Sequence, residues 1–300
     1  MQTMTGRRWG LAAGMLVVAA ATVLAQAPEG TIVAEVPSQY QKITVFDTPA
    51  GFRQMIFDAK WDGWDAIQSE MNKTDPLELT MAYSRHMVTS LALVDKPKRI
   101  LIVGLGGACL QRYLYKNLPE TRIDTAELDP QVLTVAKKYF DLKEDARQTV
   151  TIGDGRKFIE QSKDKYDVIM LDAFSATSIP YMLSTKEFLE AAKTRLADGG
   201  LLASNLWEMQ ADYGHMLKTY DAVFPEWHTM KCAGSTNVIL TALPVKKDIT
   251  AEKWIKAATE FEKTYKTMLV LPQLVDRGLV AKTTIPANAK VLLDKDKPKD

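Results

Sequence analysis

The sequence predicts an α/β fold in which a doubly wound, mostly parallel sheet follows a small antiparallel β-domain. Two observations lead to this fold class. β-rich runs separated by turn residues follow residue 30, and from residue 97 short apolar runs alternate with helical patterns. Strands that alternate with helices form a parallel sheet with helices on both faces. The 300 residues, 46% hydrophobic and 25% charged, suffice for one large domain and a smaller one.

The N-terminus has the pattern of an export signal. Arg7 and Arg8 precede the apolar run 11–25, and Ala25-Gln26-Ala27 forms an A-x-A cleavage site. We therefore predict a signal peptide at 1–27 and a mature chain that lies in the periplasm or another extracytoplasmic space. Because the apolar run is short for a membrane span, we expect no stable span in the mature chain. An uncleaved N-terminal membrane anchor is the alternative, and the choice between general and twin-arginine export stays open.

The first predicted domain of the mature chain, 28–96, begins with strands. Its β-rich runs are 32–36, 41–46 and 52–57, and turn residues at 37–38 and 47–51 separate them. Such runs predict a small antiparallel β-unit. Apolar residues with helical spacing from Pro76 to Val94 then predict a linking helix that ends before Pro97.

The second predicted domain, 97–243, contains the alternating elements. Its predicted strands are Arg99–Val103, Arg122–Leu128, Thr149–Ile152, Tyr166–Leu171 and Leu201–Leu206. Asp129-Pro130 supplies an N-cap and a first-turn proline for a helix that ends at Tyr139. Ser184 and Glu187 form a predicted capping box, and Asp198-Gly199-Gly200 a predicted turn before the last of these strands.

The third predicted segment, 244–300, is a C-terminal extension with a charged tail. Trp254, Ala258, Phe261 and Tyr265 share one helical face. The tail from Asp294 alternates lysine and aspartate, which is typical of a solvated terminus.

Charge and cysteine content exclude several classes of function. The chain has 38 basic and 37 acidic residues, a net charge of +1, so we expect no nucleic-acid partner. Cys109 and Cys232 are far apart, and the three histidines form no ligand cluster, so we predict no metal. Trp61, Trp64 and Trp207 are either a substrate wall or core residues, and we favour the core.

Four consecutive predicted strands end in residues that suit a nucleoside ligand. Gly104-Leu105-Gly106-Gly107 follows the first strand, and such glycines let the backbone approach a ligand closely. Glu127 ends the second strand, where a carboxylate can accept hydrogen bonds from ribose hydroxyl groups. Asp154 and Asp172 end the third and fourth. The first three positions predict an adenosine-containing ligand, and Asp172 is the candidate for the reaction itself.

These motifs resemble the spermidine synthase family of aminopropyltransferases, in particular a divergent spermidine-synthase-like branch, and more broadly the fold of class I S-adenosylmethionine-dependent methyltransferases. The resemblance covers about Tyr40 to Trp207. It rests on Tyr40–Val45, Asp62-Gly63 with Gln68, Gly104–Gly107, Glu127-Leu128-Asp129, Gly153-Asp154-Gly155 and Tyr166–Asp172.

The resemblance implies a Rossmann-like sheet behind a small β-domain, and roles for individual residues. Gln41, Glu127, Asp154 and Gly155 match positions that hold the nucleoside, and Asp172 matches the acid that accepts a proton from the attacking amine. The implied co-substrate is decarboxylated S-adenosylmethionine or S-adenosylmethionine, without a metal. The implied partner is a small-molecule amine, and the implied assembly is a homodimer or homotetramer.

Three positions depart from the family pattern. Gly107 and Ser175 stand where the family has aspartates, and Ser84-Arg85-His86 aligns with its tyrosine-histidine-glutamate stretch. The resemblance therefore supports the nucleoside-binding part of the site. A buried dication needs paired carboxylates, so the polyamine-binding part is predicted to be degenerate, with Ser175 as its candidate substrate-binding residue.

We therefore predict a spermidine-synthase-like transferase that moves an aminopropyl group from an S-adenosylmethionine-type nucleoside to an amine. A methyltransferase on the same sheet is the first alternative. The second is an exported, non-catalytic nucleoside-binding protein, because S-adenosylmethionine is a cytoplasmic metabolite. Fold alone does not decide among these.

Overall fold

The structure is a computed structural model that describes residues 29–58, 66–175 and 178–298. The predicted signal peptide, Trp61 and Trp64 lie outside the described residues. The strands are β1 (Thr31–Pro37), β2 (Lys42–Asp47), β3 (Phe52–Phe57), β4 (Ala66–Asn72), β5 (Arg99–Val103), β6 (Arg122–Glu127), β7 (Gln148–Ile152), β8 (Tyr166–Leu171), β9 (Leu196–Trp207), β10 (Glu226–Lys231) and β11 (Asn237–Leu243). The helices are α1 (Ala82–Leu91), α2 (Cys109–Asn117), α3 (Pro130–Tyr139), α4 (Gly155–Gln161), α5 (Lys186–Thr194), α6 (Tyr213–Val223), α7 (Ala251–Tyr265) and α8 (Leu271–Gly278), with short 3₁₀ turns η1 (Tyr181–Leu183) and η2 (Asp294–Asp296).

Two sheets confirm the predicted fold class. The small sheet is antiparallel with the order β1-β2-β3-β4, and the large sheet has the order β10-β11-β9-β8-β5-β6-β7. In the large sheet β5 to β9 run parallel, and β11 and β10 are antiparallel to their neighbours. The strand order reverses at β5, which lies between β6 and β8. In open α/β sheets such a switch point is where ligands bind.

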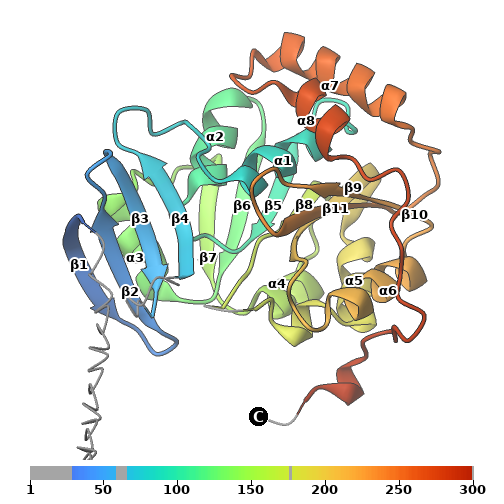
Figure 1. Cartoon of the computed structure of the whole chain (residues 1–300), viewed down its shortest axis with the longest axis horizontal. Coiled ribbons are helices and arrows are strands. Elements are labelled where there is room, and N and C mark those ends of the chain that lie inside the picture. The colour runs from blue at the N-terminus through green and yellow to red at the C-terminus, as the bar shows by residue number, and fades with distance from the viewer. Residues whose placement is uncertain (1–28, 59–65, 176–177, 299–300) are drawn as a thin grey trace, which may run out of the picture.

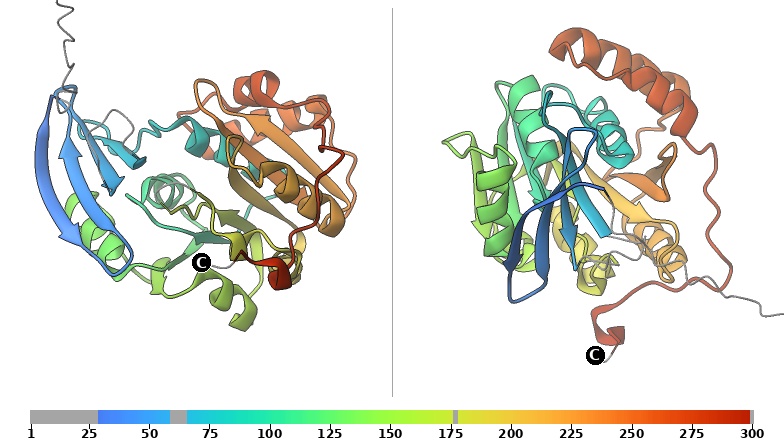
Figure 2. Two further views of the ribbon diagram at one scale, coloured as in Figure 1. Left: turned by 60° about the horizontal axis from the view of Figure 1, so that its bottom comes forward. Right: turned by 60° about the vertical axis from the view of Figure 1, so that its left-hand side comes forward.

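Helices cover both faces of the large sheet (Figures 1 and 2). The large sheet separates two apolar cores, and the small sheet forms a third. On one face α1, α2, α7 and α8 pack around residues such as Met87, Leu114 and Trp254. On the other face α4, α5 and α6 pack around residues such as Phe188. The small sheet packs on α3 through a cluster that includes Phe140. This third contact places the small sheet beside the carboxyl ends of β5 and β6.

Several elements agree closely with the sequence pattern. β5, β8 and α3 have the predicted bounds, and Asp129 caps α3 by accepting a hydrogen bond from the amide of Gln131. Trp254 lies in α7 as predicted, and its indole Nε1 donates to the carbonyl of Thr89 in α1 at 3.0 Å. The C-terminal helices are therefore part of the core.

The linking helix is shorter than the predicted range from Pro76 to Val94. It begins at Ala82. The preceding residues form hydrogen bonds with other parts of the chain, as when the Thr80 hydroxyl donates to the carbonyl of Glu70. The Arg85 guanidinium donates to the carbonyl oxygens of Leu79 and Thr80 at 2.5 and 2.7 Å. β4 has no counterpart in the predicted pattern. It turns Ser69 and Met71 inward, and a buried serine interrupts the apolar alternation that marks a strand.

Two further predictions are wrong. The N-cap of α5 is Thr185, whose hydroxyl accepts from the amide of Phe188, so Ser184 and Glu187 do not form a capping box. Glu187 instead accepts from the amide of Asp294 at 3.1 Å. Asp198-Gly199-Gly200 is not a turn before a strand, because β9 runs through it from Leu196 with a shift in register against β8.

The segment after α8 runs back along the side of the large sheet to η2 (Figure 2). It is bonded to three elements on the way. The Leu292 amide donates to Thr219 in α6, the Leu292 carbonyl accepts from the amide of Lys186, and the Leu293 carbonyl accepts from the Tyr181 hydroxyl. We call residues 285–296 the C-terminal strap. No helix among the described residues has the length and apolar character that crossing a membrane requires.

Candidate active site

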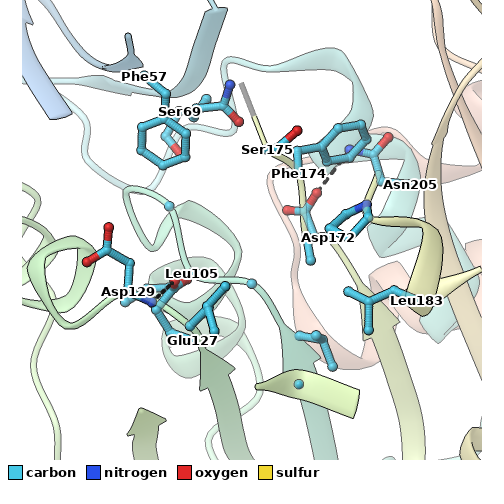
Figure 3. Close-up of a pocket in the computed structure, with 18 of the residues that line it drawn as sticks. Phe57, Ser69, Leu105, Glu127, Asp129, Asp172, Phe174, Ser175, Leu183 and Asn205 are labelled. Carbon is cyan, nitrogen blue, oxygen red and sulfur yellow. Dashed lines mark hydrogen bonds between the residues drawn. The ribbon is translucent and has the colours of Figure 1, made fainter. Parts of the chain in front are cut away.

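A cavity of about 690 Å³ opens at the carboxyl ends of the parallel strands, beside the small sheet. Its volume lies in the range of pockets for small organic ligands. Figure 3 shows its two sides: Glu127 and Asp129 lie on one, and Asp172 and Asn205 on the other, with the loop that carries Leu105 between them. Because the sequence predicts that Glu127 contacts a nucleoside and that Asp172 takes part in the reaction, we call these sides the nucleoside half and the acceptor half.

The glycine loop after β5 is shaped by close backbone contacts. Gly104 has φ +105°, and a Cβ atom there would lie 2.2 Å from the carbonyl oxygen of Asp172. Only glycine therefore permits the loop to pass this close to the end of β8. Gly104 and Gly106 line the cavity, as the predicted ligand loop requires.

Gly107, also predicted to bind the nucleoside, is not among the residues that line the cavity. Its amide donates to the Ser69 hydroxyl at 2.8 Å, and a Cβ atom would lie 2.9 Å from both the Phe140 ring and the Ser69 Cβ. An aspartate does not fit here without a shift of β4 or α3. Packing against Phe140 and Ser69 therefore disfavours an aspartate at this position.

Glu127 is the central acceptor of the nucleoside half. Its side chain is buried at the end of β6, and its two oxygens accept from the backbone amides of Leu105 and Asp129 at 2.9 and 2.8 Å. Burial raises the pKa of Glu127 to about 7, against the opposing effect of these amide donors. Each carboxylate oxygen has a second lone pair, so Glu127 can accept further hydrogen bonds from a diol at the cavity wall.

The other predicted nucleoside residues lie near Glu127. Gln41 lines the cavity, and its side-chain amide lies 3.5 Å from Asp129 Oδ2. Asp154 and Gly155 line it at the start of α4, where Asp154 accepts from the amides of Arg156 and Lys157. Asp154 is therefore a helix cap that also lines the cavity.

Asp172 dominates the acceptor half. It lies half-buried directly after β8, and Asn205 Nδ2 on β9 donates to its Oδ1 at 2.9 Å (Figure 3). Burial raises the pKa of Asp172 to about 7, and hydrogen bonds from Asn205 and the Tyr83 hydroxyl lower it. The Tyr83 pKa is itself raised well above its usual value, chiefly by burial. Asp172 is thus a carboxyl group that titrates near neutral pH, as a general base at such a pH should.

The remaining wall of the acceptor half comes from the loop after β8 and from the end of β9. Phe174, Ser175 and Pro180 line the cavity on the loop. Trp207 lines it at the end of β9, and its indole Nε1 donates to Thr236 Oγ1 at 2.8 Å. The prediction that Trp207 is a core residue is therefore wrong, because its ring forms part of the cavity wall. Ser175 is exposed, and its hydroxyl interacts with Ser178.

Some residues of the site have no signal in the sequence pattern. Tyr83 directly precedes the Ser84-Arg85-His86 stretch, and its position in a helical pattern does not indicate its hydrogen bond to Asp172. Asn205 lies within an otherwise apolar strand, where a buried polar residue is the only signal for a role at the strand end.

Among residues 29–58, 66–175 and 178–298, no group of histidine, cysteine and acidic side chains has the arrangement of a metal site.

Comparisons with known proteins give one family. The family model for the spermine/spermidine synthase domain matches residues 80–238, which is more than half of the chain. A polyamine aminopropyltransferase of Vibrio vulnificus is 35% identical over 224 residues, which cover 72% of this chain and 74% of that protein.

Two solved structures have similar folds. The spermidine synthase of Thermotoga maritima matches with a TM-score of 0.65 at 19% identity, over 84% of each chain, a likeness of fold alone. Human methyltransferase-like protein 13 in complex with SAH matches with a TM-score of 0.57 at 27% identity, over 62% of this chain and 93% of that one. The match to the family model, together with the similarity to the Vibrio vulnificus protein, shows that the chain belongs to the spermine/spermidine synthase family.

Proposed function

We propose that this protein binds an S-adenosylmethionine-type nucleoside, with the decarboxylated form as the preferred co-substrate, and transfers its aminopropyl group to an amine. One observation carries the proposal: a single cavity joins a buried diol acceptor, Glu127, to a separate carboxyl group, Asp172, which titrates near pH 7. The naming of similar proteins as polyamine aminopropyltransferases supports the transfer of this group.

The nucleoside half orients the donor. Glu127 accepts from the two ribose hydroxyl groups, while the backbone of Leu105 holds the carboxylate in place. Asp154 accepts from the adenine amino group at the other end of the nucleoside. Each hydrogen bond to a carboxylate contributes about 1.5–3 kcal/mol. The glycine loop lets the sulfur-bearing part of the ligand pass close to the backbone on its way to Asp172.

The acceptor half prepares the amine. A free alkylamine has a pKa of about 10, so at neutral pH it enters as an ammonium ion. Above pH 7 Asp172 is ionised and attracts this ion, and it accepts a proton from the nitrogen. The freed lone pair forms the new C–N bond while the C–S bond breaks, and the bonding electrons remain on sulfur as a neutral thioether. One proton is released overall, through Asp172 to solvent.

A methyltransferase is the second candidate. The observation that favours it is the likeness to human methyltransferase-like protein 13, at 27% identity. The same nucleoside half would bind the donor, and Asp172 would position the nucleophile. Mass spectrometry of the product separates the two, because it carries either an added aminopropyl group or an added methyl group.

Binding is tested by calorimetric titration of the protein with S-adenosylmethionine, its decarboxylated form and methylthioadenosine. We expect binding of the decarboxylated form and of methylthioadenosine, with turnover when an amine is added. If none of the three binds, both the aminopropyltransferase and the methyltransferase proposals are wrong. If they bind but every amine and protein tested fails as an acceptor, a non-catalytic nucleoside-binding role takes their place.

We also propose that the chain is exported and that its mature form begins near Pro28. The proposal rests on the signal-peptide pattern at 1–27. N-terminal sequencing of the protein from fractionated cells should find a start after Ala27 in the extracytoplasmic fraction. An intact Met1 in the cytoplasmic fraction would contradict the proposal.

A further inference from the structure

A chain of amide groups leads from Asp172 to the protein surface. Asn205 Nδ2 donates to Asp172 Oδ1, Asn237 Nδ2 donates to Asn205 Oδ1, and the Ser235 hydroxyl donates to Asn237 Oδ1, at 2.9, 2.9 and 2.6 Å. An ionised carboxylate only accepts hydrogen bonds, so it fixes which way the Asn205 amide points. The Asn205 carbonyl oxygen then faces Asn237, so the Asn237 amide must turn its NH₂ group towards Asn205. We call Asn205 and Asn237 the amide chain.

This orientation determines what the amide chain offers to a ligand. Both side chains line the cavity. The Asn205 carbonyl oxygen accepts from Asn237, and the Asn237 carbonyl oxygen accepts from Ser235. Each NH₂ group has two hydrogens and donates one of them, to Asp172 from Asn205 and to Asn205 from Asn237. The wall next to Asp172 is therefore richer in donors than in acceptors. An ammonium group brings three donors and no acceptor, so it is poorly matched to this wall. A hydroxyl or carbonyl oxygen is well matched.

The charges of the two halves also differ. Among the described residues that line the cavity, the carboxylates are Glu127, Asp129, Asp154 and Asp172. Glu127 ends β6, and Asp129 and Asp154 follow β6 and β7, so these three lie in the nucleoside half. Asp172 is the one described carboxylate in the acceptor half. Phe174 and Trp207 also line this half, in addition to Tyr83, whose hydroxyl bonds to Asp172. One carboxylate balances one ammonium ion, and a second buried cation without a partner is strongly disfavoured.

We propose that the acceptor is a primary amine with a single positive charge and a neutral, hydrogen-bonding tail, such as an amino alcohol. Its ammonium group pairs with Asp172, its alkyl part lies against Phe174 and Trp207, and its tail oxygen accepts from the amide chain. This substrate class deepens the proposed function and rests on it, because it presupposes transfer to an amine.

The test compares two amines of equal length. One is the four-carbon diamine with an amino group at each end, and the other is the aminobutanol in which a hydroxyl group replaces one of these amino groups. With decarboxylated S-adenosylmethionine as donor, we expect kcat/KM for the amino alcohol to exceed that for the diamine by about 10-fold or more, because only the diamine buries an unpaired charge. Equal rates, or a preference for the diamine, would overturn the acceptor class and leave the transferase proposal standing. Transfer to neither amine, with the nucleoside still bound, would overturn the acceptor class, and the wider screen of amines and proteins would then decide the transferase proposal.

A substitution that adds a countercharge sharpens the test. Ser175 lines the cavity three residues after Asp172, so Ser175→Asp places a second carboxylate on the acceptor wall. We expect this variant to shift the ratio of the two kcat/KM values towards the diamine by about 10-fold or more. Ser178→Asp adds the same charge to the same loop at a residue that is not among those lining the cavity, and it should leave the ratio unchanged. An equal shift in both variants would mean that general charge, rather than the acceptor wall, determines selectivity, and would overturn the proposal.

Discussion

The two halves of the cavity hold their acidic groups by different means. In the nucleoside half, backbone amides of Leu105 and Asp129 bond to Glu127. In the acceptor half, side chains from other elements bond to Asp172: Asn205 from β9 and Tyr83 from α1. Burial nevertheless raises the pKa of both acids to about 7. The two carboxyl groups thus have similar raised pKa values, although backbone amides hold one and side chains hold the other.

This difference shows which half can change its specificity. Backbone donors persist whatever side chains replace their neighbours, so the nucleoside half tolerates sequence change while it keeps its ligand. Single substitutions alter the side-chain donors of the acceptor half, and with them the charge and the hydrogen-bonding character of the wall. Divergence within such a family should therefore concentrate around Asp172. The departure at Ser175 lies on that side, whereas the departure at Gly107 lies in the glycine loop and is set by packing against Ser69 and Phe140.

The largest expected effect comes from Asp172→Asn. Loss of a general base lowers turnover by about 10²–10⁴-fold, and the side chain remains the same size. Glu127 and Asp154, the proposed acceptors for the nucleoside, form no described hydrogen bond with Asp172, so the affinity for methylthioadenosine should change little. Stopped assays of product formation and calorimetric titration measure the two quantities. Retained turnover would show that Asp172 is not the base.

Glu127→Gln should give the opposite pattern with a smaller effect. The substitution replaces a charged acceptor by a neutral one, and hydrogen bonds to charged groups contribute about 1.5–3 kcal/mol. We expect the nucleoside to bind about 10- to 100-fold more weakly, while kcat at saturating nucleoside stays near that of the wild type. A fall in kcat without a change in affinity would contradict the assignment of Glu127 to the nucleoside half.

The same contrast separates what the sequence predicts from what it does not. Glu127, Asp154 and Asp172 are predictable because parallel strands end at one edge of a sheet, so residues at successive strand ends meet there. The cap of α3 is predictable because Asp129-Pro130 acts within one turn.

The acceptor half depends instead on tertiary pairing. Asn205 and Asn237 meet only because β9 and β11 are neighbours, with Asn237 opposite Trp207 in the register. Neither asparagine follows a period that marks it as a site residue. The same holds for Ser69, whose bond to the glycine loop joins the two sheets. Residues at the ends of parallel strands are therefore predictable from sequence, whereas residues that meet through strand pairing are not.

Both raised pKa values should also cost stability in the absence of ligand. Between the pKa of an unfolded aspartate, 3.8, and about 7, folded Asp172 retains a proton that the unfolded chain releases, so its contribution to stability falls as pH rises through this window. Asp172→Asn removes this cost. We expect the variant to be more stable than the wild type by about 4 kcal/mol at pH 8 and nearly equal to it at about pH 4. Urea unfolding at the two pH values measures the difference, and a variant destabilised at both would argue against a buried charge.

Asn205→Ala should move the pH dependence of the acceptor half alone. The amide bond to Asp172 favours the ionised carboxylate, so its loss raises the pKa further. We expect the rise of kcat/KM with pH to shift upward by about one pH unit, with nucleoside affinity unchanged. Asn237→Ala should give a smaller shift in the same direction, because it acts only through Asn205. An unshifted profile in both variants would show that the amide chain does not position Asp172.

The smallest expected effect lies on the nucleoside side, at the C-terminal strap. Arg156 lines the cavity next to Gly155, and its Nη1 donates to Asp294 Oδ1 in η2 at 2.7 Å. The Arg156 guanidinium lowers the pKa of Asp294, and the neighbouring Leu293 carbonyl holds Tyr181 of the loop after β8. Asp294→Asn weakens this attachment, and partly exposed ion pairs contribute about 0.5–1 kcal/mol. Nucleoside affinity should therefore fall by about 2- to 5-fold.

The matched control is Asp296→Asn, which removes the same charge from the same turn. It should have no effect on nucleoside affinity, because no described bond joins Asp296 to Arg156. An equal loss in both variants would trace the change to net charge, and the strap would then have no part in shaping the nucleoside half.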